Sequence, residues 1–203
     1  MKIFCIGRNY VNHAKELKNP IPKQPLVFTK PITALLTKDK PFYYPAFSTD
    51  IHFEAELVLK MSRHGRHIDE KFAYKYYDEI AVGIDLTARD VQQNLKEKGH
   101  PWDIAKGFDG SGPISEFVPI DNLKDKENIK FSLTQNGEQK QIGFSKDMIF
   151  SFNILIAHLS KYFTLQKGDY IYTGTPEGVG PVAIGDKLEV FLEDETMLKC
   201  EIK

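Results

Sequence analysis

Residues 51–59 alternate between two faces, and this pattern constrains the fold more than any other segment of the chain. One face carries Ile51, Phe53, Ala55, Leu57 and Leu59, and the other carries His52, Glu54, Glu56 and Val58. Alternation with a period of two predicts a β-strand, because successive side chains of a strand point to opposite faces of the sheet. We therefore predict a half-buried strand with two carboxylates on its polar face.

The other segments predict a domain in which strands outnumber helices. Strands are expected at residues 2–6, 80–86 and 129–134, and helices at residues 72–78, 88–98 and 151–163. Asn136 and Gly137 predict a tight hairpin turn, and Thr87 with Asp90 resembles a helix-capping signature. Further short strands follow residue 164. Because strands and helices do not alternate regularly, we expect a β-rich α+β fold.

Composition excludes several classes of partner. The chain has 203 residues, 41% hydrophobic and 27% charged, which predicts a single soluble domain over residues 1–203. Lysine plus arginine (27) nearly balances aspartate plus glutamate (28), so we expect neither nucleic acid nor a membrane surface as a partner. The most apolar stretch, residues 148–159, is too short to cross a bilayer, and the first seven residues do not form a secretory signal. Cys5 and Cys200 are expected to be reduced, as in a cytoplasmic protein.

Three acidic residues are candidate metal ligands. Glu54 and Glu56 lie one residue apart on the predicted strand, so their Cα atoms should be about 7 Å apart on one face. Asp85 ends the strand at 80–86, although aspartate is depleted in strands. A solvated strand face and a helix cap are the alternative interpretations. Three carboxylates with open positions suit Mg²⁺ or Mn²⁺, which prefer oxygen ligands.

Two further positions suggest catalysis. His13 and Glu16 are three residues apart, so one helical turn would place both side chains on one face, where they could act as a general base. The alternative is an exposed loop with ordinary polar residues. Lys106 lies in the glycine-rich segment AKGFDGSGP, where the backbone can approach a ligand closely, although a surface lysine is the simpler interpretation.

Six motifs follow one another along the chain. They are GRNY with a following HxxE, then FTKP, ExEL, GIDLTARD, WDIAKGFDGSGP and TGTPEGVGP. Each is weak alone, but together and in this order they cover residues 7–181. The chain resembles the short, single-domain members of the fumarylacetoacetate hydrolase family. The resemblance implies the mixed β-roll of that family's C-terminal domain, and a homodimer.

The resemblance also implies roles for particular residues. Glu54, Glu56 and Asp85 would bind Mg²⁺ or Mn²⁺. His13 and Glu16 would activate water from a mobile lid at residues 9–25, with Lys106 as the third catalytic residue. The residues implied to bind substrate are Arg8, Lys30, Arg89, Gln92, Thr173 and Thr175.

The implied activity is hydrolysis of a carbon–carbon bond in an acylpyruvate-type 2-oxo acid, through a metal-stabilised enolate. An isomerase, decarboxylase or oxaloacetate tautomerase of the same family is the first alternative. A non-catalytic module that binds 2-oxo acids is the alternative from another class.

Overall fold

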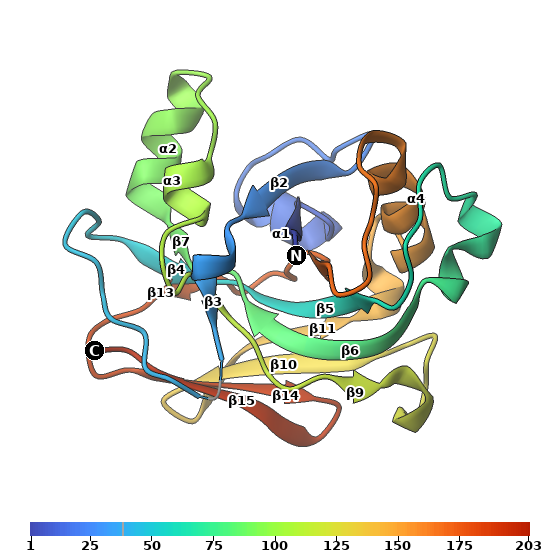
Figure 1. Ribbon diagram of the computed structural model, residues 1–203. Helices are drawn as coiled ribbons and strands as arrows, with labels where there is room; N and C mark the ends of the chain where they lie inside the picture. Colours follow the sequence, from blue (N-terminus) through green and yellow to red (C-terminus); the bar gives the residue numbers. More distant parts are fainter. Residues whose placement is uncertain (38) are drawn as a thin grey trace.

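Strands dominate the structure, a computed structural model that describes residues 1–37 and 39–203 (Figure 1). The strands are β1 (Ile3–Gly7), β2 (Leu26–Lys30), β3 (Leu35–Leu36), β4 (Ile51–Phe53), β5 (Ala55–Met61), β6 (Tyr77–Ile84), β7 (Thr87–Ala88), β8 (Gly112–Pro113), β9 (Val118–Pro119), β10 (Lys130–Gln135), β11 (Glu138–Phe144), β12 (Tyr170–Tyr172), β13 (Gly180–Pro181), β14 (Lys187–Leu192) and β15 (Glu195–Glu201). The α-helices are α1 (Val11–Glu16), α2 (Arg89–Glu97), α3 (Asp103–Lys106) and α4 (Phe152–Tyr162), and the 3₁₀ helices are η1 (Ile32–Ala34), η2 (Glu70–Lys75), η3 (Ile120–Asn122) and η4 (Ser145–Asp147). The predicted β-rich α+β class is confirmed.

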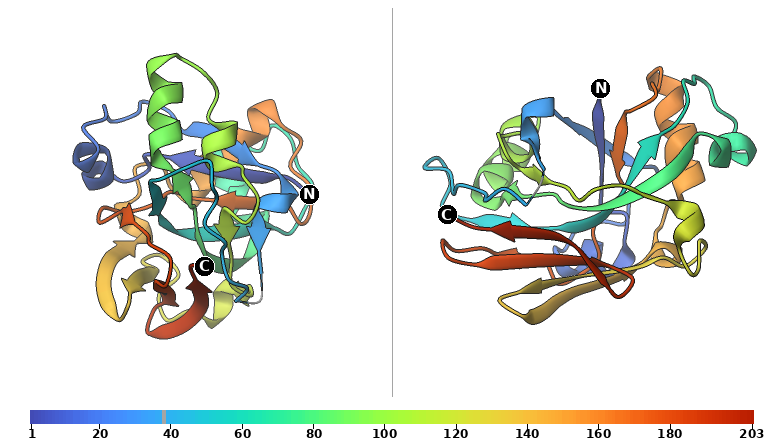
Figure 2. Two further views of the ribbon diagram at one scale, coloured as in Figure 1. Left: turned by 90° about the vertical axis from the view of Figure 1, so that its left-hand side faces the viewer. Right: turned by 60° about the horizontal axis from the view of Figure 1, so that its bottom comes forward.

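Two larger sheets form the body of the molecule. Within the described residues, one sheet has the strand order β2-β1-β12-β5-β6-β9 and the other the order β11-β10-β14-β15. The second sheet lies as a layer below β5 and β6 in Figure 1, and the right-hand view of Figure 2 shows the same layering. Two small sheets, β13-β4-β7 and β3-β8, complete the mixed arrangement. None of the helices in the described part of the chain could span a membrane.

The strand β5 is buried on both faces. Leu57 and Leu59 belong to the main core, which also contains residues of the four-stranded sheet such as Phe131. Val58, on the opposite face, packs in a second apolar cluster with Cys5 and Tyr172. The predicted alternation is therefore confirmed, but the prediction of a half-buried strand is wrong. A second layer of chain covers the face that the sequence pattern left open.

Local predictions succeeded where the turn or cap is encoded by adjacent residues. Asn136 and Gly137 both have positive φ values, as a tight hairpin between β10 and β11 requires. Ser151 caps α4 by accepting a hydrogen bond from the backbone N–H of Ile154. Cys5 and Cys200 are free thiols and buried, as expected.

Three further predictions differ from the structure. The strand at 51–59 is interrupted at Glu54, so that β4 pairs with β7 and β13, while β5 joins the large sheet. The helix at 72–78 is a 3₁₀ helix that starts and ends earlier, η2. Thr87 does not cap α2; its hydroxyl donates to the backbone oxygen of Asp85, and Ala88 occupies the N-cap position.

Candidate metal centre and active site

The pairing of β5 with β6 brings the three acidic side chains together. Ala55 is opposite Ile84 in this antiparallel ladder, so the next pair outward is Glu54 and Asp85, and the Asp85 N–H donates to the Glu54 carbonyl at 2.8 Å. Directly opposite side chains start about 5 Å apart at Cβ. Glu56 lies two residues further along the same face. Carboxylate oxygens of all three residues lie within 4.8 Å of one another.

All three carboxylates are buried, with exposed fractions of 5% for Glu54 and 1% for both Glu56 and Asp85. Lys106 neutralises part of this charge, because its ammonium lies 2.8 Å from Glu54 Oε2 and 2.7 Å from Asp85 Oδ2. Burial alone would raise the pKa of Glu54, but Lys106 and Arg89 outweigh it and hold that pKa well below its usual range. Burial would likewise lower the pKa of Lys106, but Asp85 and Glu54 raise it, so this lysine is charged at neutral pH.

Glu56 lies in a different electrostatic environment. Burial and the nearby Asp85 raise the pKa of Glu56, and a hydrogen bond of 2.7 Å from the Gly174 N–H only partly offsets them. Gly174 has a φ of 106°, and a Cβ there would lie 2.6 Å from the Cβ of Asn9, so this approach to Glu56 requires glycine.

The donor set fits a divalent cation. All its ligand atoms are carboxylate oxygens, the type that Mg²⁺ and Mn²⁺ prefer. The Lys30 ammonium forms an ion pair with Asp85 Oδ1 at 2.9 Å. The two groups are not aligned as a hydrogen bond, and no other described residue donates one to this buried oxygen. It therefore retains lone pairs for a ligand. A cation among these oxygens would also relieve the repulsion that raises the pKa of Glu56.

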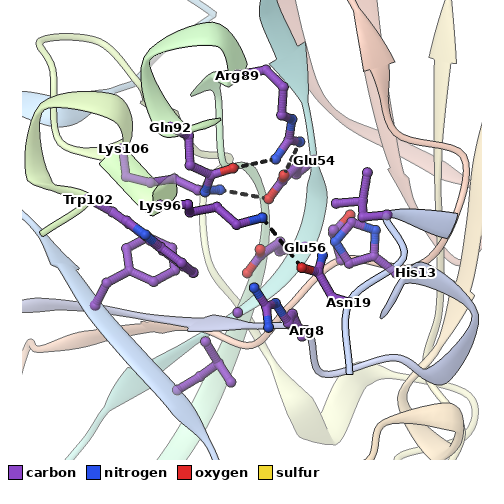
Figure 3. Close-up of a pocket in the computed structure, with 15 residues that line it drawn as sticks. Arg8, His13, Asn19, Glu54, Glu56, Arg89, Gln92, Lys96, Trp102 and Lys106 are labelled. Carbon is purple, nitrogen blue, oxygen red and sulfur yellow. Dashed lines mark hydrogen bonds and ion pairs between the residues drawn. The ribbon is translucent and has the colours of Figure 1, made fainter. Parts of the chain in front are cut away.

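The short helix α1 places His13 over the same pocket (Figure 3). Its side chain is almost fully buried, and its Nδ1 lies 3.3 Å from Glu16 Oε2. Because a carboxylate only accepts hydrogen bonds, Nδ1 carries the proton and Nε2 keeps a free lone pair. Burial lowers the pKa of His13, and Glu54 and Glu16 only partly counteract it, so the imidazole is neutral at pH 7.

α1 rests on the loop that follows β12. Glu16 Oε1 accepts a hydrogen bond of 3.0 Å from the Gly178 N–H, and Asn12 Nδ2 donates to Glu177 Oε1 at 3.0 Å. Within residues 9–25, α1 is the one helical element and no strand is formed in this described segment. With α1 in this position the pocket has only about 30 Å³ of free space, enough for one or a few water molecules.

The helix α2 and an aromatic pair form the opposite wall. Arg89 donates to Gln92 Oε1 at 2.8 Å and forms an ion pair with Glu54, so Arg89 and Gln92 share one face of the helix. Phe28 and Trp102 pack with ring centroids 6.0 Å apart, and the Lys106 ammonium lies 5.2 Å from the Phe28 ring centroid.

Most of the predicted site residues line one pocket. Those that line it are Arg8, His13, Glu54, Glu56, Arg89, Gln92, Lys106 and Thr175. Asp85, Lys30 and Thr173 are buried and are not among the lining residues. Lys30 supports Asp85 and donates to Ser111, and the Thr173 hydroxyl donates to the Leu57 carbonyl at 2.9 Å.

Sequence reasoning missed three polar residues at the site. Gln141 on β11 accepts a hydrogen bond from the Ala55 N–H at 2.8 Å and donates to Thr175 Oγ1 at 2.9 Å, so it ties the metal-ligand strand to the loop after β12. Nothing in its local sequence distinguishes it from other polar strand residues. Lys96 and Asn19 also line the pocket. Lys96 was detectable, because it lies on the helical stripe of Arg89 and Gln92.

Comparison with known proteins identifies the family. The family profile described as fumarylacetoacetate (FAA) hydrolase C-terminal matches residues 2–203. The chain belongs to the fumarylacetoacetate hydrolase family. This confirms the resemblance inferred from the motifs, the fold that it implied, and the expectation that the chain is an enzyme.

Family relatives with named activities cover nearly the whole chain. The mitochondrial oxaloacetate tautomerase FAHD1 of Bos taurus is 40% identical over 201 residues, which are 99% of this chain and 91% of the relative. Oxaloacetate tautomerase YcgM of Escherichia coli is 41% identical over 197 residues, 97% of this chain and 90% of the relative. The crystal structure of fumarylpyruvate hydrolase from Pseudomonas aeruginosa in complex with Mn²⁺ and pyruvate matches with a TM-score of 0.93 at 32% identity, covering 100% of this chain and 90% of that one.

Proposed function

We propose that this enzyme is a divalent-metal-dependent oxaloacetate tautomerase, which interconverts the keto and enol forms of a 2-oxo dicarboxylic acid. The observation that carries the proposal is a buried triad of carboxylates, two of which, Glu54 and Glu56, line the same pocket as the neutral His13. The relatives named oxaloacetate tautomerase favour this isomerase reaction over the acylpyruvate hydrolysis that the sequence suggested first.

Glu54, Glu56 and Asp85 would hold the metal, with Mg²⁺ as the first choice and Mn²⁺ as the second. Bound there, the cation would polarise the 2-oxo group as a Lewis acid and so acidify the neighbouring C3–H bond. Lys30 and Arg89 hold two of these carboxylates in place through ion pairs. Such outer contacts orient metal ligands and commonly matter tenfold or more for affinity.

His13 would move the proton. Its Nε2 accepts the proton from C3, the C–H electron pair becomes the C2–C3 double bond, and the imidazolium returns the proton to the 2-oxo oxygen. Glu16 supports this role because it keeps the proton on Nδ1 and favours the charged imidazole. The ammonium of Lys106 supplies fixed positive charge beside the developing negative charge.

Residues 9–25 would act as a lid within a single catalytic domain of residues 1–203. The small free space in the pocket supports this, since a four-carbon substrate is larger than that space. Backbone hydrogen exchange tests the lid directly. Mg²⁺ plus oxalate should slow exchange in residues 10–25 relative to metal-free protein, and an unchanged rate there would contradict a lid.

A cytoplasmic homodimer completes the proposal. The two buried free thiols support a reducing compartment. Phe47 and Ile104 are exposed side chains that line one apolar groove, a surface suited to a second copy of the chain. Sedimentation of the purified protein distinguishes monomer from dimer.

Fumarylpyruvate-type hydrolysis is the second candidate. The crystal structure of the Pseudomonas aeruginosa relative favours it, and the same dyad would then activate water instead of abstracting a proton from carbon. Purified enzyme with Mg²⁺ should be assayed for enol–keto conversion of oxaloacetate, for pyruvate release from oxaloacetate and for acylpyruvate cleavage.

We expect tautomerisation to be fastest. Faster cleavage of the acylpyruvate would reverse the assignment and restore the first sequence-based hypothesis. Binding of oxalate without turnover in any of the three assays would favour the non-catalytic module.

A further inference from the structure

The pocket contains more positive charge than its acidic residues neutralise. Lys106, Lys30 and Arg89 form ion pairs with carboxylates of the metal triad. Arg8 and Lys96 also line the pocket, but in the described part of the chain no carboxylate lies within ion-pair distance of either. These two cations are therefore available to a ligand.

Lys96 reaches the pocket from the last turn of α2. Arg89, Gln92 and Lys96 follow one another at spacings of three and four residues, so they form one stripe on the helix. Arg89 donates a hydrogen bond to Gln92 and forms an ion pair with Glu54, whereas Lys96 lies nearer the end of the helix. Its ammonium makes one hydrogen bond, 3.4 Å to Asn19 Oδ1 on the chain that follows α1.

Arg8 enters the same space from the other side. It follows β1 with a φ of 59°, a left-handed conformation that is unfavourable for residues other than glycine. Figure 3 shows its guanidinium and the Lys96 ammonium on either side of the Glu56 carboxylate, with Asn19 beside them. Burial lowers the pKa of Lys96, and Arg8 and Arg89 lower it further, so like charges are close together here. An anion bound between Arg8 and Lys96 would replace this repulsion with attraction to both side chains.

We propose that Arg8 and Lys96 form a second anion subsite, which binds the far carboxylate of a 2-oxo dicarboxylic acid while the metal triad receives its 2-oxo acid end. This inference rests on the proposed function and deepens it, because it assigns the specificity for a dicarboxylate to two named side chains. The hydrogen bond to Asn19 links the subsite to residues that follow α1, so an anion held by Lys96 also favours the closed position of the lid.

The subsite is tested by equilibrium binding of unreactive analogues to the Mg²⁺-loaded enzyme. Malate and lactate share a 2-hydroxy acid end, but only malate has a second carboxylate, and oxalate is too short to reach beyond the metal end. Calorimetry should show that wild-type enzyme binds malate at least tenfold more tightly than lactate. A charge-assisted hydrogen bond typically contributes an effect of this size.

Lys96→Met keeps most of the length of the side chain and removes its charge. We expect it to weaken malate binding about tenfold and to leave lactate and oxalate binding within twofold of wild type. Arg8→Gln should act in the same direction, and Lys96→Arg should retain most of the malate affinity. Lys98→Met, an exposed position beyond the same helix, is the matched control and should change none of the three affinities.

Two results would overturn the subsite. Equal wild-type affinities for malate and lactate would show that no group recognises the far carboxylate. An equal loss for all three ligands in Lys96→Met would show that Lys96 only latches the lid through Asn19. A failure of the proposed function has a different signature, namely no Mg²⁺-dependent binding of oxalate to the wild-type enzyme.

Discussion

Glu54 and Glu56 of the metal triad line the same pocket as His13 of α1, but the triad and α1 are held in the fold by different forces. The triad is attached to β5 and the end of β6, where ladder hydrogen bonds and two apolar clusters fix the backbone. α1 has only six residues and no side-chain cap, and its outer end is held by polar contacts at Asn12, Glu16 and Asn19. A helix this short is not stable by itself in water.

The firmly held triad and the weakly held α1 meet two different requirements of the proposed enzyme. A metal site needs ligands that stay in place, and buried strands provide them. A base that must let substrate enter and then cover it needs an element with a low free energy of local opening. Asn9 and Tyr10 are fully or almost fully buried and anchor the start of the segment, so opening would pivot about them and move His13 and Glu16 together.

The largest expected effect is at the rigid region. Glu54→Gln removes one ligand charge, so we expect the activity with Mg²⁺ to fall to the level of metal-free protein. At about 100 times its Kd, Mg²⁺ should stabilise wild-type protein by about 2.7 kcal/mol and the variant hardly at all, as measured by thermal unfolding. Glu195→Gln on the exposed face of β15 is the control. If Mg²⁺ stabilised Glu54→Gln as much as wild-type protein, Glu54 would not be a metal ligand.

At α1, His13→Ala should lower the rate of oxaloacetate tautomerisation by about 10²- to 10⁴-fold, the usual contribution of a general base. Stabilisation by Mg²⁺ should be unchanged, because the metal ligands lie on other elements. Lys15→Ala on the same helix is exposed and should behave as wild type. A wild-type rate for His13→Ala would assign the base to another group, and lost Mg²⁺ stabilisation would show that the two regions are not independent.

Gln141→Leu tests the residue that joins the two regions through Ala55 and Thr175. The change leaves the buried Ala55 N–H without its acceptor, which should cost about 1–3 kcal/mol of unfolding free energy. We also expect the rate to fall about tenfold, because the loop that supports α1 loses its anchor. Gln139→Leu on the exposed side of the same strand is the control for denaturant unfolding and kinetics. Lost stability with full activity would show that α1 does not depend on this loop.

The smallest expected effect is a shift in pH dependence. His13 accepts a proton only when neutral, so kcat/KM should rise with pH through its pKa, which burial lowers from the usual value, and then level off. Glu16 raises that pKa, so Glu16→Gln should move the acid limb to lower pH while the amide oxygen still accepts from Gly178. A shift to higher pH would contradict the dyad.

Much of the local structure was predictable from neighbouring residues. The alternation of residues 51–59, the Asn136-Gly137 turn and the helix at 151–163 depend on interactions two to four positions apart, and the structure confirms them. Thr87 shows where such signals mislead. A capping pattern depends only on neighbouring residues, whereas in the structure the Thr87 hydroxyl donates to the Asp85 carbonyl and accepts a hydrogen bond from Lys106.

The sequence by itself determined the family, through the order of its motifs. It also singled out the three acidic residues as candidate metal ligands. Only the tertiary structure decided that Glu54 faces Asp85 across a ladder, that Lys30 and Thr173 are buried and do not line the pocket, and that Gln141, Asn19 and Lys96 belong to the site. The physical reason is the sequence separation of the contacts involved. A strand's register and the layer that covers its second face depend on segments tens of residues away, and these distant contacts set the burial and the charge of each side chain.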